Sequence, residues 1–193
     1  MLSEKFIEAL TFAAQLHATQ KRKGSGVPYI AHLLGTASIA LEYGANETEA
    51  IAALLHDAIE DQGGAPIREE IRRQFGDAVT AIVDGCTDAD SIPKPPWRQR
   101  KEAYIASIPT ASASVRLVTA ADKLYNARSV LKDYRVLGEE LWQLFAGRKA
   151  GTLWYYRSLV EALRAAASIP LVEELDRVVT QIEQLASGSG VKM

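Results

Sequence analysis

The sequence predicts an all-α fold, a bundle of roughly eight to ten helices. Apolar residues recur at the three- and four-residue spacing of a helix over most of the chain, and no convincing run alternates apolar with polar residues as a half-buried strand does. Glycine, proline, Asn and Asp separate the periodic segments, and no internal repeat is visible. With 193 residues, 48% of them hydrophobic, and a mean hydropathy of −0.05, the chain is long enough to bury a sizeable core.

Capping and breaking residues mark where these helices begin and end. Asn46, with Glu49 three residues later, has the pattern of a capping box, and Gly44 before it suits the end of a helix. Pro66 suits the first turn of a helix, and Pro170 interrupts the helical last third of the chain. The predicted helices cover residues 6–16, 32–43, 46–62, 66–76, 77–83, 97–108 and 115–131, with further helical residues from 139 to 186.

Composition narrows the class of protein. The single cysteine, Cys86, excludes an internal disulfide and favours a reducing, cytoplasmic setting. No apolar run reaches membrane-spanning length, and the N-terminus lacks the pattern of a signal peptide. A formal net charge of −2 argues against nucleic-acid binding through bulk charge, whereas the basic clusters at 21–23 and 98–101 suit a small polyanion. The sequence leaves the oligomeric state open.

The most informative stretch is residues 53–61, an apolar helical run that contains four ionisable side chains. His56 and Asp57 are adjacent, and Glu60 and Asp61 follow one helical turn later. Burying this much charge is costly unless something compensates for it, and a divalent metal ion is the simplest compensation. Because residues three and four apart share a face of a helix, we expect both acids to crowd the site that the His-Asp pair defines.

The remaining metal ligands are expected from other segments. The chain has three histidines and one cysteine, so a thiolate zinc site is excluded by count. Two imidazoles with two carboxylates would suit Mn²⁺, Fe²⁺, Mg²⁺ or Zn²⁺. The segments 28–32 and 120–126 are the best sources of further ligands. Asp122 follows a largely small and apolar run, which favours an inward-facing carboxylate that needs a partner.

These motifs together resemble the HD phosphohydrolase superfamily. His32, His56, Asp57 and Asp122 match its ordered His, His-Asp and Asp pattern. The surrounding motifs resemble the hydrolase domain of RelA/SpoT enzymes and its stand-alone form, the small alarmone hydrolase. In chain order they are the basic pair at 22–23, PYIxH, ALLHDxxED, VxxxTD and ADKLYNxR. Five ordered motifs make a specific match, whereas the His-Asp dipeptide alone is a weak signal.

The resemblance covers residues 6–134 and implies an organisation for the chain. We expect a single HD-type hydrolase domain over 1–186, in which residues 135–186 form a helical C-terminal extension. The Ser- and Gly-rich residues 187–193 are expected to be a flexible tail.

The resemblance also implies a reaction. The family removes the 3′-pyrophosphate from (p)ppGpp, giving GDP or GTP and pyrophosphate, and generally uses Mn²⁺. The implied metal ligands are His32, His56, Asp57 and Asp122. The implied water-activating pair is Glu60 and Asp61. The implied nucleotide contacts are Arg22, Lys23, Asn126 and Ser129, and the further cations available for phosphate oxygens are Arg100, Lys101 and Lys123.

Other interpretations stay open beside this one. The same chemistry on (p)ppApp, a different HD nucleotide phosphohydrolase such as a 5′-nucleotidase, and a non-catalytic alarmone-binding protein all share the metal ligands. Intact Glu60 and Asp61 argue against a pure binding protein, which needs no water activator. The sequence departs from the usual pattern at Gln62, Leu33 and Cys86, none of which is a ligand position.

Several other residues are expected to have structural roles. His17 is expected to be a buried, hydrogen-bonded residue, and Cys86 a small core residue. The tryptophans are expected to be packing residues and not platforms for stacking bases; they are Trp97, Trp142 and Trp154.

Overall fold

The computed structural model describes residues 1–89, 93–167 and 169–188, and helices account for most of them. In chain order the elements are α1 (Glu4–Leu16), α2 (Ile30–Glu42), α3 (Glu47–Leu55), α4 (Ala58–Gln62), α5 (Ala65–Phe75), α6 (Asp77–Cys86), α7 (Trp97–Ser107), η1 (Ile108–Thr110), α8 (Ala113–Leu137), η2 (Gly138–Leu144), α9 (Arg148–Ala166) and α10 (Pro170–Ala186). Within these ranges there is no strand, only one isolated bridge between Lys21 and Pro28. The all-α prediction is confirmed. Of the predicted tail, residues 189–193 lie outside the described residues.

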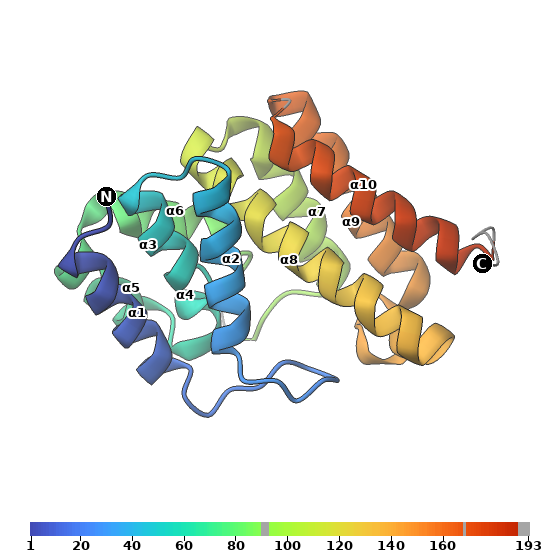
Figure 1. Cartoon of the computed structure of the whole chain (residues 1–193), viewed down its shortest axis with the longest axis horizontal. Coiled ribbons are helices and arrows are strands. Elements are labelled where there is room, and N and C mark those ends of the chain that lie inside the picture. Colours follow the sequence, from blue (N-terminus) through green and yellow to red (C-terminus); the bar gives the residue numbers. More distant parts are fainter. Residues whose placement is uncertain (90–92, 168, 189–193) are drawn as a thin grey trace.

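The long helix α8 runs through the middle of the molecule (Figure 1). On one side it contacts α2, α3 and α6, against which α1 and α5 pack in turn. On its other side it contacts α9, and α10 lies along it. The helices of the first half of the chain are thus joined through α8 to those of the C-terminal extension.

Local sequence signals account for most helix boundaries. Asn46 and Glu49 form the predicted capping box, in which each side chain accepts from the other residue's backbone N–H. Pro66 lies in the first turn of α5, as predicted. Asp77 is the first residue of α6, and Gly76 stands at the cap. Gly76 ends α5 and begins α6 with a φ of 86°, a backbone conformation that glycine adopts without strain.

The prediction of one continuous helix through the His-Asp motif is wrong. α3 ends at Leu55, α4 begins at Ala58, and His56 and Asp57 form the junction between them. Consecutive side chains on an α-helix point about 100° apart, so an unbroken helix aims two neighbours in different directions. The junction lets both side chains reach one point, as their contacts show below.

The core is built from aliphatic side chains, and small residues set the helix spacing around the site. At Gly35 on α2, an added Cβ would lie 2.0 Å from the Tyr125 ring on α8, so glycine is needed for these helices to approach each other. The largest fully buried side chains are Leu33, Leu54, Leu55, Ile59, Ile71, Ile108, Leu124, Leu141, Leu159, Leu163, Leu171 and Leu175.

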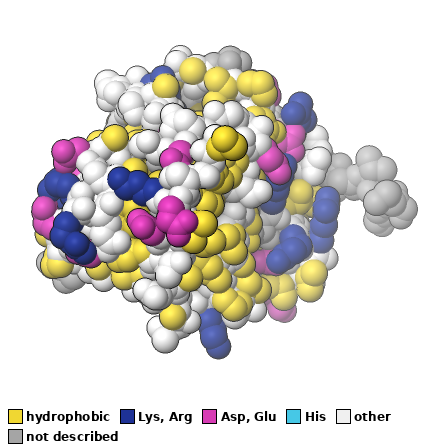
Figure 2. All heavy atoms as spheres, turned by 60° about the vertical axis from the view of Figure 1, so that its left-hand side comes forward, with side chains coloured by type: hydrophobic (Ala, Val, Ile, Leu, Met, Phe, Trp, Pro, Cys, Tyr) yellow, Lys and Arg dark blue, Asp and Glu magenta, His cyan; other side chains and the backbone are white. Residues whose placement is uncertain are grey.

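The surface carries charges of both signs. Figure 2 shows the face at the left of Figure 1, where basic and acidic side chains lie intermixed among apolar and neutral ones. This pattern agrees with the small net charge. None of the helices within the described ranges is long and apolar enough to cross a membrane.

Candidate metal centre and adjoining cavities

Four side chains from three parts of the chain converge on one point. His32 lies in the first turn of α2, His56 and Asp57 lie at the α3–α4 junction, and Asp122 lies on α8. The two Nε2 atoms of His32 and His56 are 3.2 Å apart. Asp57 Oδ2 lies 3.2 Å from the first of these nitrogens and 3.0 Å from the second. Asp122 Oδ1 lies 3.3 Å and 3.5 Å from the same two atoms.

These spacings fit a divalent metal ion. Ligand atoms about 2.1 Å from an octahedral ion lie about 3 Å from their neighbours, which is the separation of each carboxylate oxygen from the two imidazole nitrogens. His32, His56 and Asp57 form the compact group of donor atoms, and Asp122 meets it through the two imidazoles. His56 Nδ1 lies 2.9 Å from the Ala53 carbonyl oxygen, an arrangement in which Nδ1–H donates and the Nε2 lone pair is left for a metal. Two imidazoles and two carboxylates are a donor set that suits Mn²⁺, Fe²⁺ or Zn²⁺.

Electrostatics favour positive charge at this point. Burial alone raises the pKa of Asp57 and Asp122. For Asp57, the neighbouring imidazoles of His56 and His32 outweigh burial and hold the pKa well below its ordinary range. For Asp122, Lys123 and then His56 have the same effect on the pKa. Burial also lowers the pKa of His56, yet the two carboxylates raise it well above its ordinary value. The carboxylates therefore stay ionised and favour a cation between them, either an imidazolium or a metal ion.

Neighbouring side chains hold the two carboxylates in place. The Tyr29 hydroxyl donates to Asp57 Oδ2 at 2.7 Å. Lys123 Nζ donates to Asp122 Oδ2 at 2.5 Å, and Asn126 Nδ2 donates to Asp122 Oδ1. Such partners fix the orientation of metal ligands.

The acidic pair on α4 lies beside the centre and is held by other partners. Glu60 Oε1 accepts from Lys94 Nζ at 2.8 Å, and Asp61 Oδ2 accepts from Gln20 Nε2 at 2.7 Å. Burial and the nearby Asp88 carboxylate raise the pKa of Glu60, while Lys94 opposes them. A carboxylate with a raised pKa is a better proton acceptor than one in water.

A cavity of about 440 Å³ opens next to the centre, in contact with several predicted substrate-binding residues. Arg22 lies between two aromatic rings, with its guanidinium carbon 5.7 Å from the Tyr29 ring centre and 5.9 Å from that of Tyr125. Its Nη2 donates to Asn126 Oδ1 at 2.6 Å. The residues that line this main cavity are Gln20, Lys21, Arg22, Lys23, Ser25, Val27, Tyr29, Asp61, Lys101, Tyr125, Asn126, Ser129, Val130, Lys132, Asp133, Phe145 and Tyr156.

Two predicted cations lie elsewhere. Arg100 is absent from the described lining of the main cavity; its Nη1 donates to Asp88 Oδ1 at 2.5 Å and lies 4.0 Å from Glu60 Oε1. Lys123 lines a smaller side cavity of about 210 Å³ instead. This side cavity shares Lys101 with the main one, so the two cavities adjoin.

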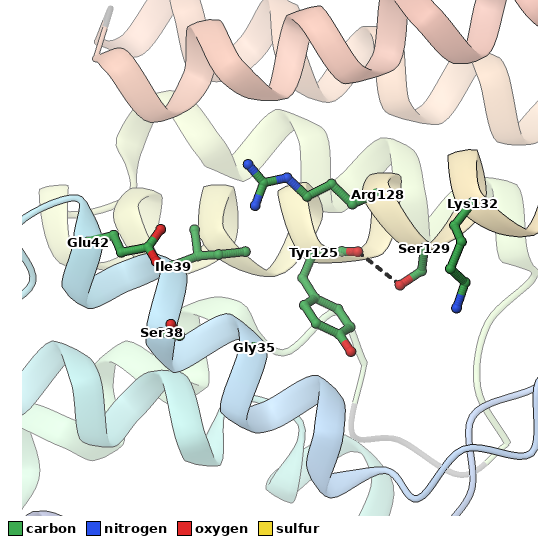
Figure 3. A pocket seen from close by; sticks show the side chains of 8 residues that line it. All are labelled: Gly35, Ser38, Ile39, Glu42, Tyr125, Arg128, Ser129 and Lys132. Carbon is green, nitrogen blue, oxygen red and sulfur yellow. Dashed lines mark hydrogen bonds between the residues drawn. The ribbon is translucent and has the colours of Figure 1, made fainter.

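Figure 3 shows a separate groove of about 380 Å³ between α2 and α8. Tyr125 and Ser129 border both this groove and the main cavity, and the Ser129 hydroxyl donates to the Tyr125 carbonyl oxygen at 3.1 Å (Figure 3). The main cavity is lined by Tyr29 and Asn126, which bond to the carboxylates of Asp57 and Asp122, whereas the groove is lined by neither of these two residues. It is therefore a neighbour of the site rather than part of it.

Sequence analysis missed several residues of the site. Tyr29 belongs to the PYIxH motif, three positions before the predicted ligand His32, and its place in that motif is a signal that it lies near the metal centre. Gln20, by contrast, reaches Asp61 across 41 positions of sequence. Phe145 and Tyr156 come from the C-terminal extension, and no local pattern marks them as cavity residues.

The residues expected to be structural are so placed. His17 Nδ1 lies 2.6 Å from Gln20 Oε1, and its ring stacks on Tyr29, outside the metal cluster. Cys86 has a pKa raised to about 11 by burial, so its thiol stays protonated at neutral pH. Trp142 is buried, and Trp97 packs edge-on against Trp154.

Comparison with known proteins gives consistent matches. A family model described as HD domain matches residues 9–153. The human guanosine-3′,5′-bis(diphosphate) 3′-pyrophosphohydrolase is 35% identical over 171 residues, covering 83% of this chain and 91% of that protein. Its Xenopus tropicalis counterpart is 42% identical over 127 residues, covering 64% and 68% respectively.

Solved structures agree. A metazoan ortholog of SpoT, described as hydrolysing ppGpp and playing a role in starvation responses, superposes with a TM-score of 0.79 at 29% identity, covering 94% of this chain and 97% of that one. A crystal structure of a Listeria monocytogenes protein superposes with a TM-score of 0.68 at 28% identity, covering 78% and 97%.

Proposed function

This chain belongs to the HD-domain family, and we propose that it is a metal-dependent hydrolase of the guanosine alarmones (p)ppGpp. Its products are pyrophosphate and GDP or GTP. The observation that carries the proposal is the position of Asn126, whose amide bonds both to Asp122 in the metal centre and to Arg22 in the main cavity. A nucleotide held by Arg22 thereby lies next to the predicted ligands.

The family implies a divalent ion, and we propose Mn²⁺ held by His32, His56, Asp57 and Asp122. When bound, such an ion lowers the pKa of a water molecule and neutralises charge on phosphoryl oxygens. The spacing of the donor atoms supports a divalent ion, and the mixed imidazole and carboxylate set is compatible with Mn²⁺, the ion that the family resemblance implies.

We assign the acidic pair, Glu60 and Asp61, to the water molecule that attacks the phosphorus. In the reaction, a water oxygen bonds to the phosphorus attached to O3′, and the bond from that phosphorus to O3′ breaks. One water proton ends on O3′, and pyrophosphate leaves. We assign Glu60 to accept a proton from the water, which its raised pKa supports, and Asp61, whose carboxylate accepts from Gln20, to orient the water.

The cavity walls bind the nucleotide. Arg22 lines the main cavity together with the Tyr29 and Tyr125 rings that it contacts, and we assign the purine ring to this cationic and aromatic wall. Asn126 and Ser129 lie on the wall that α8 contributes and serve ribose or base. The remaining predicted contacts in the cavity walls provide positive charge for phosphate oxygens; they are Lys23, Lys101 and Lys123. Arg100, which is bound to Asp88 outside the described cavity linings, is proposed to add positive charge from behind Glu60.

The proposal extends to the setting of the enzyme. We place residues 1–186 in one HD-type hydrolase domain that works in the cytoplasm on a small purine nucleotide and not on nucleic acid. The small net charge and the single cysteine support this setting.

Product analysis tests the function. Purified protein with Mn²⁺ is incubated separately with ppGpp, ppApp and a set of deoxynucleoside monophosphates, and the products are separated. We expect GDP and pyrophosphate from ppGpp. Turnover of ppApp alone would reassign the base and keep the chemistry. Orthophosphate from deoxynucleotides, with both alarmones untouched, would overturn the proposal.

Chelation tests the metal. We expect activity to vanish after treatment with excess chelator and to return most fully with Mn²⁺, with one ion per chain by elemental analysis. Full activity in excess chelator would contradict the assignment of the four ligands.

A further inference from the structure

A chain of hydrogen bonds leads from a buried histidine to the acidic pair. Asp61 Oδ2 accepts from Gln20 Nε2 at 2.7 Å, and the other end of that amide, Gln20 Oε1, lies 2.6 Å from His17 Nδ1. His17 caps the C-terminal end of α1, and the Gln20 backbone N–H donates to its carbonyl oxygen at 3.0 Å. The end of α1 thus brings one side-chain amide to the carboxylate that is assigned to the water.

The donor and acceptor roles in this chain are fixed from its acidic end. A carboxylate only accepts, so the Gln20 atom that faces Asp61 is the amide nitrogen, and the amide oxygen faces His17. Two atoms only 2.6 Å apart need a proton between them, so His17 Nδ1–H donates to that oxygen. Gln62 Nε2 is 3.3 Å from His17 Nδ1 and closer to the amide oxygen of Gln20, to which it is a second donor.

His17 itself does not reach the substrate. The residue is 2% exposed, and it is not among the residues that line the main cavity or the side cavity. Burial lowers the pKa of His17, and its Nε2 has no hydrogen-bond partner among the described residues. A protonated ring would leave a buried N–H unpaired at Nε2, so the ring is neutral and its one N–H points to Gln20. Any effect of His17 on the reaction therefore passes through another side chain.

His17 has two routes to the site. One is the hydrogen bond to Gln20. The other is the ring of Tyr29, on which His17 stacks with ring centres 5.3 Å apart, and whose hydroxyl donates to Asp57. The first route depends on the N–H and the second on the shape of the ring. The hydrogen bond carries more information, because a side-chain amide turned end for end would aim its oxygen at Asp61, and an N–H donor opposes that turn.

We propose that His17 is a positioning residue for the hydrolysis: its Nδ1–H fixes the orientation of the Gln20 amide, and Gln20 in turn holds the Asp61 carboxylate toward the attacking water. This inference rests on the proposed function, which assigns Asp61 to that water. Without the Nδ1–H, Gln62 is the remaining donor to the amide oxygen, so the amide is held less firmly and a part of the activity is lost.

Two substitutions separate the N–H from the ring. His17→Phe keeps an aromatic ring against Tyr29 and removes the donor, whereas His17→Asn removes the ring and keeps an N–H at the position of Nδ1. Loss of a hydrogen bond between neutral groups corresponds to about a 3- to 10-fold change, so kcat for ppGpp should fall by that factor in His17→Phe. KM should stay within about a factor of two, because Asp61 is assigned to the water and not to the nucleotide.

The second variant and the metal content make the result specific. His17→Asn should keep kcat within about a factor of two of the wild type, because the donor is restored. Both variants should retain the metal by elemental analysis. Unchanged kcat in His17→Phe would overturn the proposal. So would the reverse order, with His17→Phe fully active and His17→Asn impaired, because the ring and not the N–H would then be the part that matters.

A double-variant cycle tests whether His17 acts through Gln20. Gln20→Leu removes the amide and should lower kcat at least as much as His17→Phe. The double variant should be no slower than Gln20→Leu alone, because the first residue has no effect once the second is gone. Effects that multiply would overturn the proposal. Gln74→Leu is the matched control: Gln74 Nε2 also donates to a carboxylate, that of Glu70 on α5, and its loss should leave kcat unchanged.

Nitrogen NMR separates this inference from the proposed function, because it needs no turnover. With Mg²⁺ in place of paramagnetic Mn²⁺, the wild-type protein at neutral pH should show His17 as the neutral Nδ1–H tautomer. The side-chain amide signals of Gln20 should move in His17→Phe and much less in His17→Asn. If the wild type shows these signals but leaves ppGpp intact, the proposed function fails and the hydrogen-bond chain stands. An Nε2–H tautomer in an enzyme that hydrolyses ppGpp would overturn the inference and leave the function standing.

Discussion

Asp57 and Glu60 lie three residues apart and are almost equally exposed, yet their carboxyl groups behave in opposite ways. The side chain of Asp57 is 21% exposed and that of Glu60 is 22% exposed. Burial raises the pKa of Asp57, but the imidazoles of His56 and His32 outweigh burial and lower this pKa well below its ordinary value. Burial and Asp88 raise the pKa of Glu60, against the opposing effect of Lys94. Neighbours, and not exposure, separate the two carboxylates.

The difference matches two different tasks. A metal ligand must stay ionised, and Asp57 is held ionised by the two imidazoles and by the Tyr29 hydroxyl. A proton acceptor must be able to take a proton near neutral pH, and Glu60 is shifted toward that range. Pairs of acids whose environments push their pKa values apart are the usual sign of such a division of roles.

The largest effect is expected from Asp57→Ala. The change removes a ligand from the centre and leaves two buried imidazoles without that carboxylate, so both the metal and the activity should be lost. Elemental analysis of the purified variant, with an activity assay on ppGpp, measures the two outcomes. Glu69→Ala, an exposed acid on α5, is the control and should keep both. Normal metal content in Asp57→Ala would remove that residue from the ligand set.

Glu60→Ala should separate chemistry from metal binding. We expect full metal occupancy with kcat lowered by about 10² to 10⁴, the usual contribution of a general base. The same two measurements apply, so the variants can be compared directly. If Glu60→Ala loses the ion as Asp57→Ala does, the two carboxylates share one task and the comparison fails.

Arg22→Ala should act on substrate binding alone. Its guanidinium lies between Tyr29 and Tyr125 and is assigned to the purine, so KM for ppGpp should rise about 10-fold while kcat stays within about a factor of two. Michaelis curves for the variant and for the exposed Arg73→Ala measure this. A collapse of kcat at unchanged KM would move Arg22 into the reaction centre.

The smallest effect is expected from Lys94→Ala, and it appears in the pH profile. Glu60 faces Asp88 and Asp57, which raise its pKa, and Lys94, which lowers it; Arg100 lies 4.0 Å away. Without Lys94 the pKa of Glu60 rises further. Because the base acts when deprotonated, activity is lost as pH falls through this pKa, and the acidic limb of kcat should move to higher pH.

The control for this profile is Lys149→Ala, whose ammonium pairs with Glu139 on η2, away from the acidic pair. Its acidic limb should coincide with that of the wild type. An acidic limb that moves to lower pH in Lys94→Ala would show that another group acts as the base.

Much of the fold was predictable because local rules govern it. The capping box at Asn46 and Glu49, the proline in the first turn of α5 and the glycine after it all act within one or two helical turns, where sequence spacing equals spatial proximity. The continuous helix through His56 failed for the complementary reason. Both junction residues keep right-handed helical backbone angles, and their side chains meet His32 and Asp122 from other helices, which is tertiary context that the local sequence does not contain.

The sequence by itself determined the all-α class, the helix caps and, through the order of its motifs, the membership of a family with these four candidate ligands. Only the tertiary structure decided which partners each charge meets. Gly35 permits α2 to approach Tyr125, Lys94 reaches Glu60 across 34 positions, and Phe145 and Tyr156 reach the main cavity from the C-terminal extension. Helical periodicity places residues on a face, but it contains no information about which distant side chain lies opposite, and that neighbour sets the pKa and the contact.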